Sequence, residues 1–345
     1  MADKIRIAIL GCGAITRSAH LQTVLLHPDV ELVALVDTDL KGAGLLAGSL
    51  GAKCQIVADY HSVLGDVDAI INALPNNMHA VVNQEALSSG VHVLCEKPLA
   101  TTTADALASC ELAQKKNRLL GVGMNRRFAD SHTLLRLTLE QGLLGAVDGY
   151  DWEWGGSFDW RANSGFYFSR GLAGGGALID LGVHLLDSVV DWFGPVFSFD
   201  YQDDDWGSGI EANAILDLQH NGPYGIVKGR VRVSRTYTLK NRFLLRGSDA
   251  AAEIPVADPE VLILHRALAG TAVSQSLRLQ NSSSSNSYAK QLDNFVQSIR
   301  GRQSLRVDGW QGLRVIELVE ACYSHKRRIA EPWSELRTES TGVSA

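Results

Sequence analysis

The sequence predicts an α/β protein with an N-terminal doubly wound parallel sheet and a C-terminal α+β domain built on a mostly antiparallel sheet. Up to about residue 124, short apolar segments alternate with helical patterns of about ten to fifteen residues, which is typical of parallel crossover units. From residue 125 onward, segments of alternating polar and apolar residues are separated by glycine-rich or polar turns, which favours antiparallel pairing. We therefore expect two domains, at residues 1–124 and 125–345.

The strands expected in the first domain are continuously apolar, which suits a sheet covered by helices on both faces. A glycine turn and a helix that reaches about residue 26 follow the first strand. The expected strands are 5–10, 31–37, 69–74, 92–97 and 119–125.

The second domain is expected to open with a helix over 131–141 and to end with two amphipathic helices, over 288–301 and 312–328. A polar, serine-rich loop over 281–287 precedes these last two helices. Between the helices, the expected strands are 149–155, 211–219, 225–234 and 241–247.

Composition describes an ordinary globular protein of 345 residues, with 46% hydrophobic and 20% charged residues. A net charge of -6 argues against a nucleic-acid partner, and the basic cluster at 326–328 is expected to be a solvated helix end. No secretory leader and no apolar window of about 18 residues is recognised, so no membrane association is expected. The five cysteines form no CxxC pair, which favours a reduced, cytoplasmic protein without a metal site.

A dinucleotide-binding turn is predicted by "ILGCGAITRSAH", residues 9–20. Gly11 and Gly13 follow a strand and precede a helix, so backbone amides at the helix start can bind a pyrophosphate. The third glycine position of the fingerprint holds Thr16, a departure that weakens the motif, and glycines also serve tight turns for geometry alone. The residues expected to cradle the phosphates are Gly11, Gly13, Ala14 and Ile15.

The second strand ends in Asp37, about twenty residues farther on, where a carboxylate can accept hydrogen bonds from the adenosine ribose. The alternative is a solvated aspartate at a strand end. Thr38 and Asp39 follow, and this segment offers no arginine for a 2′-phosphate. The pattern therefore favours NAD over NADP.

Two further motifs hold groups capable of acid–base chemistry. "CEKPLA" (95–100) places Lys97 after a strand whose carboxyl end faces the expected ligand crevice. "GGGALIDLGVHLLD" (174–187) places Asp180 and His184 four residues apart, on one face of a helix, after three glycines that permit close approach to a ligand. A structural ion pair in the core is the alternative for Asp180 and His184, and a surface lysine is the alternative for Lys97.

Together these motifs resemble the glucose-fructose oxidoreductase, inositol dehydrogenase and rhizopine-catabolism (Gfo/Idh/MocA) family. The resemblance covers about residues 5–328 and includes "ALPNNMH" (73–79), "EKP" (96–98), "NRRF" (125–128) and "GGGALIDLGVHLLD" (174–187). It implies an N-terminal Rossmann domain and a C-terminal domain whose large open sheet mediates homo-oligomers, as dimers or tetramers. It also implies that Lys97 reaches the nicotinamide and substrate, Asp180 holds substrate hydroxyls, and His184 is the acid/base.

The resemblance adds further candidates for ligand contacts. Asn76, His79 and Glu96 are expected near the cofactor, although His79 can instead cap a helix and Glu96 can brace its loop. Arg126 and Arg127 either bind substrate or pin the domain interface, and the sequence does not separate these roles. The other candidates for substrate contact are Trp160, Arg161, Tyr237 and Tyr288.

The expected function is an NAD-dependent oxidoreductase acting on a secondary alcohol or ketone of a sugar, cyclitol or related polyol. His184, with an unperturbed pKa near 6.5, suits the proton transfer, and the Lys97 ammonium suits the developing alkoxide charge. Three alternatives stay open at this point: a nucleotide-linked keto-sugar reductase, an NAD-dependent glycosidase and a non-catalytic NAD-binding regulator.

Overall fold

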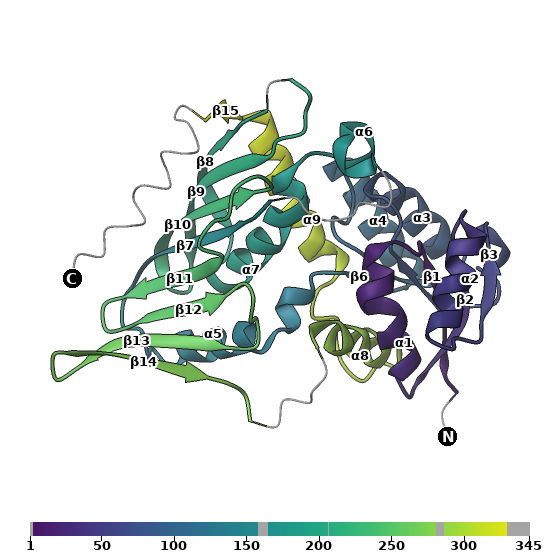
Figure 1. The fold of residues 1–345 in the computed structure, drawn as a ribbon, viewed down its shortest axis with the longest axis horizontal. Coiled ribbons are helices and arrows are strands. Elements are labelled where there is room, and N and C mark those ends of the chain that lie inside the picture. Colours follow the sequence, from purple (N-terminus) through teal and green to yellow (C-terminus); the bar gives the residue numbers. More distant parts are fainter. Residues whose placement is uncertain (1–2, 158–164, 206, 281–285, 330–345) are drawn as a thin grey trace.

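A computed structural model describes residues 3–157, 165–205, 207–280 and 286–329 as two sheets with helices packed around and between them (Figure 1). In the first sheet the strand order is β3-β2-β1-β4-β5-β6, and every pair is parallel. Its strands are β1 (Ile5–Leu10), β2 (Val30–Val36), β3 (Gln55–Val57), β4 (Ala69–Asn72), β5 (His92–Cys95) and β6 (Leu120–Val122).

Four helices connect these strands: α1 (Leu21–Leu26), α2 (Leu40–Ser49), α3 (Asn76–Ser88) and α4 (Thr103–Lys116). The chain reverses its direction of winding between β1 and β4, so the carboxyl ends of these strands flank the crevice where such folds bind ligands. This confirms the expected doubly wound sheet. The strand β3 is not predictable from the sequence, because its three residues are too few to form an apolar pattern.

The second sheet, within the described residues, has nine strands in the order β14-β13-β12-β11-β7-β10-β9-β8-β15. It is mostly antiparallel, as expected, with parallel pairs only at β10–β7 and β15–β8. The strands are β7 (Val147–Gly155), β8 (Val196–Asp203), β9 (Asn213–Gly222), β10 (Gly225–Ser234), β11 (Arg242–Gly247), β12 (Ala251–Pro255), β13 (Leu262–Leu268), β14 (Thr271–Leu277) and β15 (Arg327–Arg328).

The helices of the second half are α5 (Asp130–Glu140), α6 (Arg170–Ala173), α7 (Val183–Phe193), α8 (Ser287–Ile299) and α9 (Gly309–Ser324). Helices α5, α7 and α9 lie on the side of the second sheet that faces the first domain (Figure 1). The basic cluster at 326–328 is not a helix end, because α9 stops at Ser324 and Arg327 and Arg328 form the edge strand β15.

Helix α7 forms the centre of the second domain, packed against an aromatic cluster on the sheet. Trp192 and Phe193 of α7 contact Tyr150, Trp152 and Phe243, all of them buried. The segment Arg170–Phe193 is apolar and long enough to cross a membrane by length and composition alone. However, 78% of its apolar window is buried inside the protein, so the burial of α7 in the core accounts for its composition.

Helix α8 lies beyond the predicted boundary at residue 124 but packs on the first sheet. Its residues Leu292, Phe295 and Val296 share one apolar core with Ile7 and Ile9 of β1. The chain therefore returns to the first domain before α9, which an assignment of continuous sequence ranges does not capture.

Candidate functional site

The glycine turn between β1 and α1 is shaped for close backbone approach. Gly11 has φ +91°, and a Cβ placed there would lie 2.4 Å from the carbonyl oxygen of Ala73, so this position requires glycine. At Gly13, by contrast, an added Cβ would meet no atom within 4 Å. Gly13, Ala14 and Ile15 are all partly exposed, so the turn leaves room above its backbone for a phosphate.

Thr16, at the third fingerprint position, is fully buried and donates a hydrogen bond from its hydroxyl to the Gly11 carbonyl, at 2.6 Å. It opens a π-helical turn, Thr16–His20, ahead of α1. The sequence predicts that this departure weakens the motif. In the structure, the hydrogen bond from Thr16 to Gly11 joins the first helical turn to the glycine turn. Residues 13–15, which lie between them, remain partly exposed.

Asp37 lies at the end of β2 beside the glycine turn. Its Oδ2 accepts a hydrogen bond from the Cys12 amide at 2.7 Å, and its Oδ1 accepts one from the Asp39 amide at 2.9 Å. The carboxylate is partly exposed, and each oxygen has a second lone pair for a ribose hydroxyl. The turn and Asp37 together fit the pyrophosphate and ribose of a dinucleotide.

Two residues of the "PNNMH" segment bond to the protein itself. His79 is buried, with Nδ1 at 2.6 Å from the Pro98 carbonyl oxygen and Nε2 at 2.8 Å from that of Leu74. Both ring nitrogens thus lie at backbone carbonyls, so His79 braces the loop that carries Lys97, and its contact with the cofactor stays a prediction. Asn76 donates to the Ala173 carbonyl at 2.9 Å, which links α3 to α6.

Glu96 braces the same loop from the other side. Its Oε1 lies 2.7 Å from Nε2 of buried His20, and its Oε2 accepts a hydrogen bond from the Lys97 amide at 3.2 Å. Burial raises the pKa of Glu96, but the contact with His20 and the charge of Lys97 outweigh it, so the pKa lies below its ordinary value. An ionised Glu96 therefore fixes the loop that presents Lys97.

Lys97 and Asp180 form an ion pair between the two halves of the chain. The lysine follows β5 and is joined to Pro98 by a cis peptide bond. Its Nζ lies 2.9 Å from Asp180 Oδ1 and 2.8 Å from the Asp180 carbonyl oxygen. The other carboxylate oxygen, Oδ2, accepts a hydrogen bond at 2.9 Å from Arg235, a residue that the sequence analysis missed.

The charges in this cluster hold one another ionised. Burial raises the pKa of Asp180, but Lys97 and Arg235 outweigh it and bring the pKa to about 2. Burial likewise lowers the pKa of Lys97, but the charge of Asp180 more than offsets this, so the ammonium persists above its ordinary range. The partly buried Tyr167, also missed from sequence, interacts electrostatically with both.

His184 lies on the first turn of α7, and its side chain is buried near these charges. Among the described residues, neither ring nitrogen has a hydrogen-bond partner, and only Nδ1 is sealed from solvent, so Nε2 is the accessible nitrogen. Burial lowers the pKa of His184 well below its ordinary value, and the charges of Lys97 and Arg126 lower it further. The imidazole is therefore neutral at physiological pH and can accept a proton.

Asp180 and His184 are not hydrogen-bonded to each other. Asp180 lies on a π-helical turn, Leu178–Gly182, whose wider winding precedes the regular helix α7. The i, i+4 spacing brings both side chains to one region, since the charge of Asp180 acts on the imidazole. The orienting partners of Asp180 are nevertheless the two cations Lys97 and Arg235.

The three glycines before this helix approach the protein rather than a ligand, contrary to expectation. A Cβ at Gly175 would lie 2.1 Å from the Tyr323 hydroxyl, and one at Gly176 would lie 1.9 Å from the Glu211 carbonyl oxygen. The buried Glu211 side chain accepts hydrogen bonds from the amides of Gly176, at 2.9 Å, and Leu178, at 2.8 Å. Because glycine has no Cβ, the start of the helix that carries Asp180 can pack directly against Glu211.

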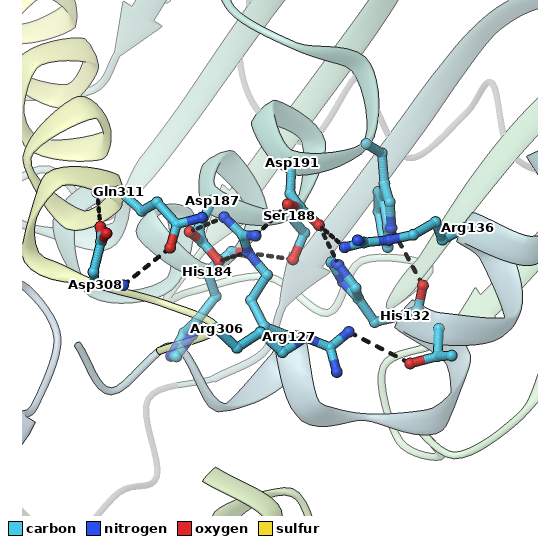
Figure 2. A network of polar contacts seen from close by, with 12 residues as sticks. Arg127, His132, Arg136, His184, Asp187, Ser188, Asp191, Arg306, Asp308 and Gln311 are labelled. Carbon is cyan, nitrogen blue, oxygen red and sulfur yellow. Dashed lines mark hydrogen bonds and ion pairs between the residues drawn. The ribbon is translucent and has the colours of Figure 1, made fainter. Parts of the chain in front are cut away.

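The structure separates the roles of the neighbouring residues Arg126 and Arg127, both on the short helix Asn125–Phe128. Arg127 is buried and forms two hydrogen bonds to Asp187 of α7, at 2.7 and 2.9 Å, and an ion pair with Asp191. Figure 2 shows this network on the helix that carries His184. Arg127 therefore anchors α7, whereas the Arg126 guanidinium stacks over the Trp154 ring, 4.1 Å from its centroid.

A cavity of about 220 Å³ lies where these elements meet. It is lined by Asn125, Arg126, Ala129, Trp154, His184, Pro259, Ser287 and Tyr288. Trp154 forms one wall, with its ring centroid 5.9 Å from that of His184. A larger hollow of about 460 Å³ beside His61 and Glu85 lacks any of the expected site residues.

The remaining candidates have different positions. Tyr288 of α8 lines the cavity and lies edge-on to His20, with ring centroids 5.5 Å apart. Tyr237 is partly buried in the turn after β10, where its amide donates to Ser234, and it does not line the cavity. Trp160 and Arg161 lie outside the described residues. Within the described ranges, no group of three or more His, Cys, Asp or Glu side chains could hold a metal.

Comparison with known proteins identifies one family along nearly the whole chain. Residues 5–124 match the NAD-binding Rossmann fold of the GFO/IDH/MocA oxidoreductase family. Residues 132–253 match a GFO/IDH/MocA C-terminal domain, and residues 228–328 match the C-terminal alpha/beta domain of the oxidoreductase family. These matches confirm the resemblance and both predicted fold types.

D-glucoside 3-dehydrogenase of Escherichia coli (strain K12) is 32% identical over 194 residues, which cover 55% of this chain and 54% of that protein. The chain thus spans about half the length of the curated relatives it matches.

Among solved structures, levoglucosan dehydrogenase with NADH and levoglucosan has a TM-score of 0.82 at 16% identity, over 94% of this chain and 97% of that one. The WlbA dehydrogenase from Bordetella pertussis, with NADH and UDP-GlcNAcA, has a TM-score of 0.78 at 20% identity, over 94% and 97%. Both of these solved structures share the fold of this chain.

Proposed function

Because the chain belongs to the GFO/IDH/MocA family of oxidoreductases, we propose that it is an NAD-dependent sugar dehydrogenase or reductase. It would transfer a hydride between nicotinamide and a secondary alcohol or ketone of a sugar or related polyol. The observation that carries this proposal is the meeting of Lys97, Asp180 and a neutral His184 at the junction of the two domains. The similarity to D-glucoside 3-dehydrogenase supports a sugar hydroxyl as the reacting group.

The residues present fit NAD at its adenosine end. The open backbone at Gly13 suits the pyrophosphate, and the partly exposed carboxylate of Asp37 suits the ribose hydroxyls. A 2′-phosphate would meet the negative charges of Asp37 and Asp39, which supports NAD over NADP. When bound, the nicotinamide supplies a two-electron hydride acceptor in the oxidation direction.

The chain's own groups handle the proton and the charge. As the carbinol carbon loses its hydride, its hydroxyl proton passes to Nε2 of His184, and the carbon–oxygen bond becomes a carbonyl. The Lys97 ammonium stabilises the negative charge that develops on this oxygen. Asp180 keeps Lys97 charged and, through its remaining lone pairs, accepts hydrogen bonds from neighbouring substrate hydroxyls. In the reduction direction the same proton moves from His184 to the new hydroxyl.

The cavity beside His184 supports a small substrate. About 220 Å³ is below the range of about 300–1,000 Å³ that drug-sized ligands occupy. A monosaccharide suits this volume better than a whole nucleotide sugar, for which only the sugar moiety would enter.

A panel of free sugars and polyols, each tested with NAD and with NADP, examines the proposal directly. We expect steady formation of reduced nicotinamide, measured by its absorbance, with at least one free sugar and a preference for NAD. Glycoside cleavage without net NADH would instead indicate a transient oxidation in a glycosidase. NAD binding without turnover on any sugar, keto-sugar or glycoside would indicate a regulator.

A further inference from the structure

Arg126 is a cation at the catalytic cavity without a carboxylate partner. Among the described residues, its guanidinium forms no hydrogen bond or ion pair and rests only on the Trp154 ring. The two other arginines near the site have carboxylate partners: Arg127 pairs with Asp187 and Asp191, and Arg235 pairs with Asp180. Arg126 is partly exposed in this cavity, so its guanidinium can pair there with an anionic group of a ligand.

The charges around the cavity leave a positive excess. Lys97 and Arg235 both pair with the carboxylate of Asp180, and the neutral His184 contributes no charge. Glu96 is directed to His20 and to the Lys97 amide. Burial lowers the pKa of Arg126 to about 10, so it remains a cation at neutral pH. Counted over the residues that the structure describes, the substrate side of the site therefore carries more cationic than anionic groups.

The position of Arg126 suits recognition of a substituent rather than of the reacting hydroxyl. In the cavity lining, the Trp154 ring centroid lies 4.1 Å from the Arg126 guanidinium carbon and 5.9 Å from the His184 ring centroid, so Arg126 and His184 border the same indole ring. The guanidinium carbon lies over the indole ring, and the guanidinium N–H groups have no hydrogen-bond partner among the described residues, so they can donate to a ligand. A carboxylate or a phosphate, each with two anionic oxygens at suitable spacing, binds a guanidinium through two parallel hydrogen bonds.

We propose that the substrate is an anionic sugar, whose carboxylate or phosphate group binds Arg126 while a ring hydroxyl lies at His184 and Lys97. This inference rests on the proposed sugar oxidoreductase function and narrows its substrate class. A carboxylate and a phosphate offer the same pair of anionic oxygens, and the test below distinguishes them.

The test measures the binding of matched neutral and anionic sugars to the NAD-bound protein by calorimetry, with Trp fluorescence as a second readout. The pairs are glucose with glucuronate and glucose 6-phosphate, and galactose with galacturonate and galactose 6-phosphate. We expect one anionic class to bind about ten- to hundredfold more tightly than its neutral partner. This ratio corresponds to the usual net contribution of hydrogen bonds to a charged group. Added salt should reduce this preference.

Substitution of Arg126 assigns the preference to this residue. Arg126→Met should reduce the ratio of anionic to neutral affinity about tenfold or more, and Arg126→Lys should retain part of it, because a point charge remains without the planar edge. Arg314→Met, at an exposed position on α9, is the matched control and should keep the ratio of the unaltered protein. Equal affinity for neutral and anionic sugars, no binding of any anionic sugar, or an unchanged ratio in Arg126→Met would overturn the inference.

NADH formation on the same sugars separates this inference from the proposed function. Arg126-dependent binding of anionic sugars without turnover of any sugar would refute the dehydrogenase and leave the anion site standing. Turnover of neutral and anionic sugars with equal kcat/KM would support the dehydrogenase and refute the anion site.

Discussion

The Nζ atom of Lys97 lies 2.9 Å from Oδ1 of Asp180, which joins the loop after β5 to the helical turn before α7. The two residues are 83 positions apart and belong to different predicted domains. Each raises the stability of the other's charged form, so the pair presents a fixed ammonium beside the neutral imidazole of His184. This relationship is the basis of the predictions below.

Asp180→Asn should lower kcat by about two orders of magnitude or more while NAD affinity changes little. The substitution removes the charge that offsets the burial of Lys97, so the ammonium loses its orientation and part of its basicity. Turnover on the best sugar of the panel, with NAD binding measured in parallel, checks this. A variant with unaltered kcat would show that the ion pair is structural only.

Arg235→Met should lower kcat about tenfold, because Asp180 Oδ2 would lose the hydrogen bond that fixes the carboxylate beside Lys97. Arg235→Lys should restore part of the loss, which a purely structural role would not require. The matched control is Arg230→Met on the exposed side of β10, where Arg230 pairs with Asp217, and its kcat should match that of the unaltered protein. Equal losses in Arg235→Met and Arg230→Met would refute the positioning role.

The pH dependence of sugar oxidation should show its acid limb below pH 6.5. The reaction needs neutral His184, which predominates above the residue's pKa, and burial with the charges of Lys97 and Arg126 sets that pKa well below 6.5. Activity should therefore persist as pH falls through 6.5 and decline only at lower pH. Because the Arg126 charge lowers this pKa, Arg126→Met should shift the limb to higher pH. A profile of kcat/KM against pH with its limb at or above 6.5 would contradict this assignment.

Asp37→Ala should weaken NAD binding and reduce the preference for NAD over NADP, because the repulsion of a 2′-phosphate is lost. Asp37 also accepts the Cys12 amide, so part of the loss would come from the glycine turn itself. Asp37→Asn keeps an acceptor for Cys12 and isolates the effect of charge. Dissociation constants for both cofactors measure this, and equal binding of NAD and NADP by the unaltered protein would refute the role of Asp37.

Gly176→Ala should destabilise the protein by roughly 1–3 kcal/mol, as expected for overpacking against backbone. The added methyl group would lie 1.9 Å from the Glu211 carbonyl oxygen, at the start of the helix that carries Asp180. Gly171→Ala is the matched control, since no atom lies within 4 Å of its added Cβ, and it should stay within about 0.5 kcal/mol. Denaturant unfolding compares the two, and similar stability of both variants would contradict the packing seen at Gly176.

The fold could be predicted from the sequence where the hydrophobic pattern is long and regular. The strands β1, β2 and β10 have six, seven and ten residues of clear pattern, whereas β3 has three residues and β14 is largely exposed and polar. Helix α8 was predicted as a helix, but its return to the first sheet depends on packing between residues nearly 300 positions apart.

Site residues could be predicted from the sequence where they belong to a motif. Their hydrogen-bond partners could not be predicted where these come from turns far away in the sequence. Lys97 and His184 were identified by their motifs, and the structure places both near Asp180. Arg235 follows β10 in a polar turn, and no local pattern indicates that it reaches Asp180, 55 residues away. Likewise, Arg126 and Arg127 are adjacent and chemically identical, and only the carboxylates of α7 distinguish them. Oligomerisation through the second sheet stays a prediction.

The most direct test of the central claim compares sugar turnover and NAD affinity in Lys97→Met, with His184→Gln as its companion. The account predicts that kcat falls by about 10²- to 10⁴-fold in each variant, the usual range for a lost acid–base or charge-stabilising group, while the NAD dissociation constant changes little. Undiminished turnover in Lys97→Met or His184→Gln, with NAD still bound, would contradict the claim that these groups carry out the reaction.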